Sequence, residues 1–197
     1  MLVVIEGPMG AGKTTLTRLL SAHFQATACY EDPGRNPFLA DLYSTQRHAL
    51  ATELQFLLQR RAQWQQLSAD LCFSDHGPDK DLLFIQQTLH PLEQELYLQL
   101  RQDLLPHPPP IDLLICLDAP LPVLRERICR RGDYWDAAMD LNYLAQIQKR
   151  YELWFAEYQG PCLDLRHRNL DFVGQEKDGI ILTELVGKTL QAMGQTI

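Results

Sequence analysis

The sequence predicts an α/β fold in which a doubly wound, parallel, five-stranded sheet is flanked by helices. Two observations predict it: short apolar runs recur along the chain, and segments with apolar residues at helical spacing fill the gaps between them. The expected strands cover residues 2–5, 28–30, 71–73, 111–117 and 162–165. The expected helices cover residues 15–23, 46–67, 89–104, 121–131, 143–158 and 177–193.

The strands are predicted from their composition and from the residues at their carboxyl ends. Residues 2–5 (Leu-Val-Val-Ile) are wholly apolar, as expected of a strand covered on both faces, and they lead into a glycine-rich segment. The apolar run at 71–73 ends at Ser-Asp, and the run at 111–117 ends at an aspartate; the runs at 28–30 and 162–165 are weaker. Ligands of such sheets bind beyond the carboxyl ends of the strands, so the polar residues there are site candidates.

The helices are predicted from spacing and from the absence of helix breakers. Residues 46–67 contain no glycine or proline and carry leucines at helical intervals, and residues 89–104 repeat a leucine every three or four positions. The proline-rich segment at 106–110 is a short surface turn between elements of one alternating pattern. We therefore expect residues 1–197 to form a single domain.

Composition narrows the class of protein. The chain has 197 residues, 46% of them hydrophobic and 22% charged, as in soluble globular proteins. A net charge of −7 argues against a nucleic-acid partner, and no apolar run is long enough for a membrane span. The five cysteines are widely spaced without a C-x-x-C pair, which predicts neither a zinc site nor a disulfide framework and favours a reducing, cytoplasmic location.

Residues 7–14 carry the most specific motif. They match G-x-x-x-x-G-K-[ST] in full, between an expected strand and an expected helix. The glycines let backbone N–H groups face phosphate oxygens, Lys13 supplies a positive charge to the outer phosphates, and the Thr14 hydroxyl is a candidate Mg²⁺ ligand. The motif alone leaves a kinase, an ATPase and a GTPase open. We expect a nucleoside triphosphate site that includes Gly7, Pro8, Met9, Gly10, Ala11, Gly12, Lys13, Thr14 and Thr15.

Two carboxylates lie directly after expected strands and point to phosphoryl transfer. Glu31 follows the strand at 28–30, and Asp75 ends the strand at 71–73. Both are expected near the phosphate-binding loop, which residues 7–14 form, where Glu31 is a candidate general base and Asp75 a candidate Mg²⁺ ligand, direct or through water. The alternative is that each is a solvated or helix-capping loop residue.

Four arginines lie close together at the end of one expected helix: Arg125, Arg127, Arg130 and Arg131. Arg127 and Arg131 are four positions apart and share a face, which suits a clamp on the transferring phosphoryl group. The alternative is a solvated basic face.

Six segments match one known family in order and spacing. They are residues 5–14, 30–39, 47–60, 74–81, 126–132 and 169–173. Together they resemble the deoxynucleoside kinase family, particularly its bacterial deoxyadenosine/deoxyguanosine kinase branch. The resemblance implies a P-loop NTPase fold of the nucleoside/nucleotide kinase type, with a helical lid around residues 125–137.

The resemblance also implies an activity and a set of contacts. The activity is ATP-dependent phosphorylation of a deoxynucleoside 5′-hydroxyl to the 5′-monophosphate in nucleotide salvage, with Mg²⁺ accompanying ATP and purine deoxynucleosides slightly favoured. Glu31 would be the general base, and Tyr43 and Asp136 would hold the sugar. The loop with Asp171 and Phe172 would border the ATP adenine. The family also implies a homodimer joined through helices. The deoxynucleoside would also be contacted by Glu53, Gln55, Arg60, Asp75 and Asp81, of which Arg60 and Asp81 would lie near the nucleobase.

Two departures from the family pattern concern specificity and the lid. Glu53 stands where the family usually has Gln, and an ionised carboxylate accepts hydrogen bonds but cannot donate them. There are three alternatives: Glu53 accepts from an exocyclic amine, it is protonated through burial, or Gln55 replaces it. Asp133 stands where the family often has Arg, which either weakens the clamp or turns away from it.

Other functions remain open from the sequence. A nucleotide-binding regulatory subunit with weak or no kinase activity is one of them. A thymidylate kinase would need a second phosphate cluster, and none is evident outside the lid. A bare ATPase would leave the segment around Glu31 without a role.

Overall fold

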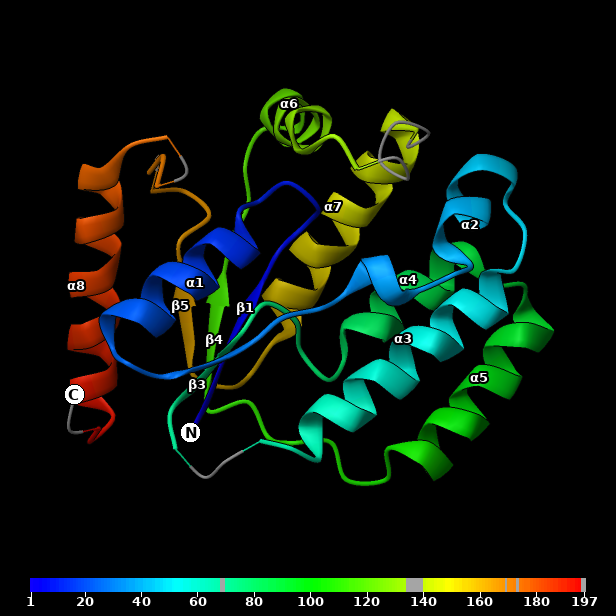
Figure 1. Cartoon of the computed structure of the whole chain (residues 1–197), viewed down its shortest axis with the longest axis horizontal. Coiled ribbons are helices and arrows are strands. Elements are labelled where there is room, and N and C mark those ends of the chain that lie inside the picture. The colour runs from blue at the N-terminus through cyan, green and yellow to red at the C-terminus, as the bar shows by residue number, and fades with distance from the viewer. Residues whose placement is uncertain (68–69, 134–139, 169, 173, 196–197) are drawn as a thin grey trace.

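The computed structural model describes residues 1–67, 70–133, 140–168, 170–172 and 174–195. Its centre is a five-stranded sheet with the order β2-β3-β1-β4-β5, in which every pairing is parallel (Figure 1). This confirms the predicted fold class. The strands are β1 (Leu2–Glu6), β2 (Thr27–Cys29), β3 (Cys72–Ser74), β4 (Leu113–Cys116) and β5 (Cys162–Asp164).

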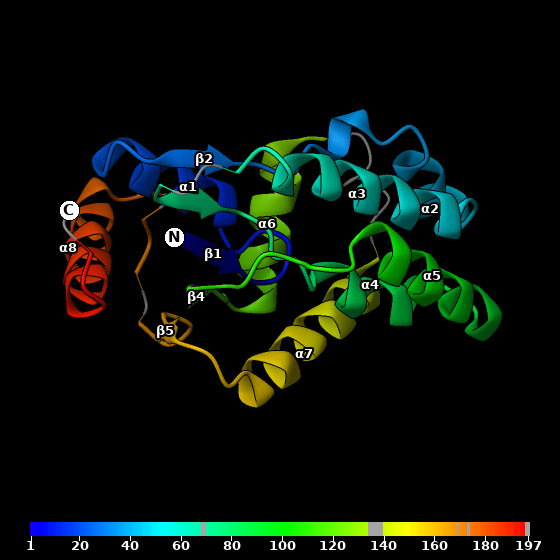
Figure 2. The same ribbon diagram turned by 90° about the horizontal axis from the view of Figure 1, so that it is seen from below.

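Helices cover both faces of the sheet. On one face lie α1 (Lys13–His23) and α8 (Glu176–Ala192); on the other lie α3 (Ala49–Trp64), α4 (Lys80–Thr88), α5 (Pro91–Leu104) and α7 (Leu141–Glu157) (Figures 1 and 2). Side chains of β1 alternate between two cores. Val3 and Ile5 pack in the core on the side of α1 and α8, and Leu2 and Val4 pack in the core on the side of α3, α4, α5 and α7.

The carboxyl ends of the strands are covered by α6 (Leu121–Arg131), which is seen end-on at the top of Figure 1. The short helix α2 (Leu39–Thr45) lies apart from the sheet, beside α3. The phosphate-binding loop, α6 and α2 therefore enclose the region where a ligand of this fold binds.

The expected elements occur with shifted bounds. The expected helix at 46–67 is α3, and the expected helix at 89–104 begins at Pro91 as α5, after a capping box formed by His90 and Glu93. Two helices were not predicted. The first, α2, has only seven residues, which is too short for a helical pattern to stand out. The second, α4, begins with Lys80 and Asp81. Both of these charged side chains are buried, so they interrupt the apolar pattern expected of a helix face that packs on the core.

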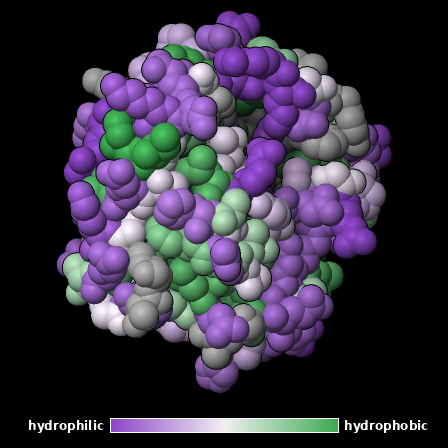
Figure 3. All heavy atoms as spheres, turned by 60° about the vertical axis from the view of Figure 1, so that its left-hand side comes forward, coloured by the Kyte–Doolittle hydropathy of each residue, from purple (hydrophilic) through white to green (hydrophobic). Residues whose placement is uncertain are grey.

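Within the described residues, no helix has both the length and the apolar character needed to span a membrane. The face that carries α8 mixes hydrophilic and hydrophobic side chains (Figure 3). Ile180, Ile181 and Met193 are among the apolar residues that α8 and its C-terminal end expose.

Candidate active site

The loop between β1 and α1 packs so tightly against β4 and α6 that only glycine fits at two positions. A Cβ atom on Gly7 would lie 2.3 Å from the carbonyl oxygen of Leu117, and one on Gly10 would lie 2.6 Å from that of Leu124. Gly10 also has a φ of 82°, in the left-handed region. The loop is therefore held in shape by the strand and the helix beside it.

Lys13 closes this loop on itself. Its Nζ donates to the carbonyl oxygens of Gly7, at 2.6 Å, and Pro8, at 3.1 Å. Burial, and then the charge of Lys80, lowers the pKa of Lys13 to about 8. The lysine stands at the first turn of α1, where positive charge and the helix N-terminus act together on an anion.

Asp75 joins the loop to the segment after β2. Its Oδ2 accepts from the Thr14 hydroxyl at 2.6 Å, and its Oδ1 accepts from the backbone N–H of Glu31 at 2.8 Å and lies 3.2 Å from Nδ1 of His76. Burial by itself would raise the pKa of Asp75, but the hydrogen bonds from His76, Thr14 and the Glu31 amide outweigh it and lower that pKa. Thr14 and Asp75 thus place a hydroxyl and an ionised carboxylate side by side, a donor set that suits Mg²⁺.

Two cations hold the carboxylate of Glu31. Nζ of Lys80 donates to Oε2 at 2.5 Å, and Nη1 of Arg60 donates to Oε1 at 3.2 Å. Burial opposes ionisation, but the charges of Lys80, His76 and Arg60 prevail and lower the pKa of Glu31 to about 2. Glu31 is therefore ionised across the physiological range.

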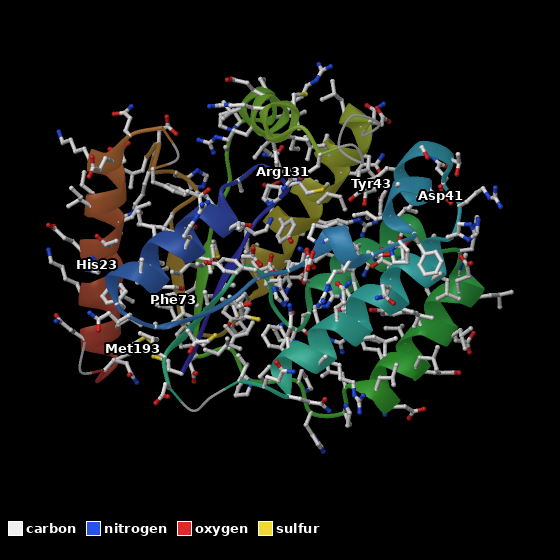
Figure 4. The ribbon with its side chains drawn as sticks, viewed as in Figure 1. His23, Asp41, Tyr43, Phe73, Arg131 and Met193 are labelled. Carbon is white, nitrogen blue, oxygen red and sulfur yellow. The ribbon has the colours of Figure 1, made fainter. Side chains whose placement is uncertain are left out.

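A cavity of about 590 Å³ extends from the phosphate-binding loop past Glu31 to α3. That volume is in the range of sites for drug-sized molecules. Tyr43 on α2 and Arg131 at the end of α6 both line it and lie toward the same side of the molecule in Figure 4. Phe56, Phe84 and Tyr143 supply apolar walls at its far end.

Buried polar side chains line that far end. Oε1 of Glu53 accepts from the Thr88 hydroxyl at 3.0 Å, and Glu53 is only 4% exposed. Burial raises the pKa of Glu53 to about 7, although the charge of Arg60 opposes this. Gln55 does not line the cavity, because two positions along a helix turn a side chain by about 200°.

Asp81 and Arg60 face this end from two helices. Asp81 accepts from Tyr97 Oη at 2.7 Å and Arg101 Nε at 2.8 Å, and both Asp81 and Arg60 line the cavity. Despite burial, the nearby charge of Asp81 raises the pKa of Arg60. The far end therefore offers a fixed cation beside a fixed carboxylate.

The arginines of α6 divide into two groups. Arg127, Arg130 and Arg131 line the cavity, whereas Arg125 does not. Nη2 of Arg127 pairs with Oδ1 of Asp171 at 3.0 Å. Nε of Arg131 pairs with Oδ2 of Asp133 at 2.8 Å, so Asp133 binds the clamp arginine and does not turn away from it.

The structure gathers most residues that the sequence singled out. Loop residues, Glu31, Tyr43, Glu53, Arg60, Asp75, Asp81, Arg127 and Arg131 line one cavity. Asp171 reaches it through Arg127, while Asp136 lies outside the described residues. Sequence reasoning gave no role to Lys80 or Tyr143; Lys80 had a signal in the matched segment 74–81, and Tyr143 had none beyond a helical pattern.

Comparison with known proteins decides the family. The family model described as deoxynucleoside kinase matches residues 3–190. The chain belongs to the deoxynucleoside kinase family. It is 30% identical over 186 residues to deoxyguanosine kinase of Bacillus subtilis (strain 168), covering 91% of this chain and 89% of that protein. It is 29% identical over 188 residues to deoxyadenosine kinase of Lactobacillus acidophilus, covering 87% of each.

Solved structures agree on the fold. Deoxyadenosine kinase from M. mycoides with bound dCTP superposes with a TM-score of 0.82 at 19% identity, covering 98% of this chain and 100% of that one. This protein is therefore a deoxynucleoside kinase on a P-loop kinase fold.

Proposed function

We propose that this kinase transfers the γ-phosphoryl group of ATP to the 5′-hydroxyl of a purine deoxynucleoside in nucleotide salvage. The observation that carries the proposal is the position of Glu31. Its backbone N–H donates to Asp75, which in turn accepts from Thr14 of the phosphate-binding loop. Its carboxylate faces the cavity that extends to α3. A substrate hydroxyl bound between the phosphate-binding loop and α3 would lie against an ionised carboxylate.

Each residue near the phosphates has a proposed role. Backbone N–H groups of the loop, Thr15 and the Lys13 ammonium hold the triphosphate, and Glu31 accepts the proton of the 5′-hydroxyl. Arg127 and Arg131 balance the charge of the transferring group. Asp171 and Phe172 border the adenine of ATP. Asp171 also orients Arg127 through their ion pair.

We propose Mg²⁺ as the cofactor that accompanies ATP. Thr14 Oγ1 and Asp75 Oδ2 would hold it, the latter directly or through water. The ion would neutralise phosphate charge when bound.

The proposed deoxynucleoside contacts lie between Glu31 and α3. Tyr43, and Asp136 in the lid, hold the sugar 3′-hydroxyl, while Phe56 and Phe84 pack against the base. Glu53, Arg60 and Asp81 contact the polar edge of the base, and Gln55 is left out because it does not line the cavity. Purine preference is supported by relatives named deoxyguanosine and deoxyadenosine kinases.

We further propose a single-domain, cytoplasmic homodimer in which residues 125–137 act as a lid. Leucines that α3 and α5 leave exposed support association through helices: Leu58 is 45% exposed, Leu92 81% and Leu96 45%. The dimer and the lid are testable by sedimentation and by nucleotide-dependent proteolysis respectively.

The experiment is a steady-state assay with Mg-ATP and deoxyadenosine, deoxyguanosine, deoxycytidine or thymidine, with thymidylate as a fifth acceptor. We expect turnover on a purine deoxynucleoside and a 10²–10⁴-fold lower kcat in Glu31→Gln, roughly the contribution of a general base. ATP binding should be intact in the variant. Turnover on thymidylate alone, or none with ATP still bound, would contradict the proposal and favour a nucleotide kinase or a regulatory subunit.

A further inference from the structure

Two cysteines that lie 46 positions apart in the chain meet at one edge of the sheet. Sγ of Cys116, the last residue of β4, lies 3.2 Å from Sγ of Cys162, the first residue of β5. Both are free thiols; Cys116 is only 1% exposed, whereas Cys162 is open to solvent. Neither residue lines the cavity of the active site, so the proposed phosphoryl transfer gives this pair no role.

The register of the two strands explains the contact. Cys162 pairs with Leu114, and Cys116 pairs with Asp164, so the two cysteines are diagonal neighbours on the same face of the sheet. With strands about 4.8 Å apart and a rise of about 3.3 Å per residue, Cα atoms of diagonal neighbours are about 8 Å apart. A disulfide usually joins Cα atoms roughly 4.4–6.8 Å apart, so a bond between these sulfurs requires the strands to shift.

The two thiols are suited to different steps of an oxidation. The Cys116 thiol donates a hydrogen bond to the sulfur of Cys162, which lowers the pKa of Cys162 although burial opposes this. The same hydrogen bond, and then burial, raise the pKa of Cys116. Asp164 and Arg166, which form an ion pair at 2.6 Å, act on Cys162 with opposite signs. A thiolate that solvent reaches, beside a second thiol, is the arrangement of redox-sensing cysteines.

We propose that Cys162 and Cys116 are a peroxide-sensitive pair whose reversible disulfide weakens the binding of ATP. The Cys162 thiolate attacks one oxygen of hydrogen peroxide and becomes a sulfenic acid, while the other oxygen takes up a proton and leaves as water. The sulfur of Cys116 then attacks Sγ of Cys162, and its proton leaves with the displaced hydroxide as a second water. The two thiols are oxidised, the peroxide is reduced, and a small thiol reverses the bond by exchange.

The effect on ATP follows from the place of β5 in the sheet, and this part of the inference rests on the proposed function. β5 is an edge strand of three residues that pairs with β4 alone, whereas β4 is held between β1 and β5. The bond therefore moves β5 more readily than β4. The chain after β5 leads to Asp171, which pairs with Arg127 at 3.0 Å and is proposed to border the adenine.

The deoxynucleoside side of the cavity should be spared. Glu31 follows β2, and β2 and β5 are the two opposite edges of the sheet. Oxidation is thus expected to weaken ATP binding and to leave deoxynucleoside binding unchanged, a split that general unfolding of the protein would not produce.

The first test maps the bond in the whole protein. The chain is reduced with dithiothreitol and exposed to hydrogen peroxide, and the remaining thiols are alkylated before proteolysis and mass spectrometry. We expect one pair of peptides joined through Cys116 and Cys162, lighter than the separate peptides by two hydrogen atoms, and separated again by dithiothreitol. A bond through any other cysteine, a bond between two copies of the chain, or no bond at all overturns the inference.

The second test measures the dissociation constant of Mg-ATP by calorimetry with reduced and oxidised protein, so it requires no turnover. We expect the constant to rise by roughly threefold or more on oxidation, the effect of losing one exposed ion-pair contact, and to return after dithiothreitol. The dissociation constants of deoxyadenosine and deoxyguanosine should not change. An unchanged constant for Mg-ATP in the bridged protein overturns the proposed effect of the bond.

Three variants assign the sulfurs. Cys162→Ser changes an exposed side chain, so it should fold, bind Mg-ATP as the wild type does and lose the response to peroxide. Cys129→Ser changes the other exposed cysteine, on α6, and is the matched control that should keep the response. Cys116→Ala should stop the reaction at a sulfenic acid on Cys162, which dimedone traps. A response that persists in Cys162→Ser, or a dimedone adduct on another cysteine, overturns the assignment.

Failure of this inference is distinguishable from failure of the proposed function. A reduced protein that turns over deoxynucleosides and shows no bond after peroxide overturns the inference and leaves the kinase intact. Absence of turnover in the reduced protein overturns the proposed function, while the bond and the affinity for Mg-ATP are still decided by mass spectrometry and calorimetry.

Discussion

Nζ of Lys80 lies 2.5 Å from Oε2 of Glu31, although the two residues are 49 positions apart in the chain. Lys80 begins α4, and Glu31 follows β2. The contact ties the helix at the far end of the cavity to the carboxylate proposed as the general base. Lys80 is thereby a positioning residue for Glu31, and its charge is the largest of those that lower the pKa of that carboxyl group.

Lys80→Met is expected to shift the acid limb of kcat/KM to higher pH. With the lysine present, the pKa of Glu31 is about 2, so Glu31 remains ionised as pH falls through the usual range of carboxyl groups. Without the lysine, burial raises that pKa again, and the base is lost by protonation at higher pH. Lys177→Met, at the exposed start of α8, is the control. Superimposable pH–rate profiles would show that Lys80 does not act through Glu31.

Arg127→Ala is expected to lower kcat by roughly 10²–10³, the cost of removing one group that stabilises the transition state. Arg127 lines the cavity and pairs with Asp171, whereas Arg125 lies two positions earlier on the same helix and does not line it. Arg125→Ala should therefore retain full kcat in the same assay. Equal losses in both variants would assign the effect to the charge of α6 as a whole.

Asp75→Asn is expected to raise the Mg²⁺ concentration that gives half-maximal rate by about tenfold or more. The amide keeps the shape of the side chain but removes the charge that binds the cation. The measurement is a Mg²⁺ titration at saturating ATP. Asp118→Asn changes a carboxylate that follows β4 and does not line the cavity, so it should leave the titration unchanged. An unaltered midpoint in Asp75→Asn would remove Asp75 from the proposed metal site.

Glu53→Gln is expected to stabilise the protein in neutral and alkaline solution and not in acid. The pKa of Glu53 is about 7 in the folded protein, against 4.5 for an ordinary glutamate. Between those pH values the folded protein holds a proton that the unfolded chain has released, so the free energy of unfolding falls as pH rises, by about 3 kcal/mol in all. Glutamine does not ionise and avoids this loss.

Urea unfolding of both proteins at about pH 4, 6 and 8 checks that prediction. The lowered pKa of Glu31 makes stability rise with pH, but it does so in both proteins and cancels in the difference. A stability difference that is the same at all three pH values would show that Glu53 does not ionise in this range.

The sequence was sufficient wherever a residue type is required by local geometry. Gly7 and Gly10 are needed because a Cβ would collide with backbone atoms, and the motif that contains them was recognised without the structure. Glu31 and Asp75 were found because the ends of parallel strands converge at one edge of the sheet. Their hydrogen bond across 44 positions confirms that convergence.

Tertiary packing decided the properties that depend on neighbours distant in the chain. Alternating apolar runs and the phosphate-binding motif were enough to predict the fold class and to propose a place for the triphosphate, because both signals are local in sequence. The choice between Glu53 and Gln55 depended on which side of α3 faces the cavity, and the ionisation of Glu53 depends on burial against α4 and on the charge of Arg60. A pKa is set by solvent exclusion and by charges around the group, and only the folded chain brings these together.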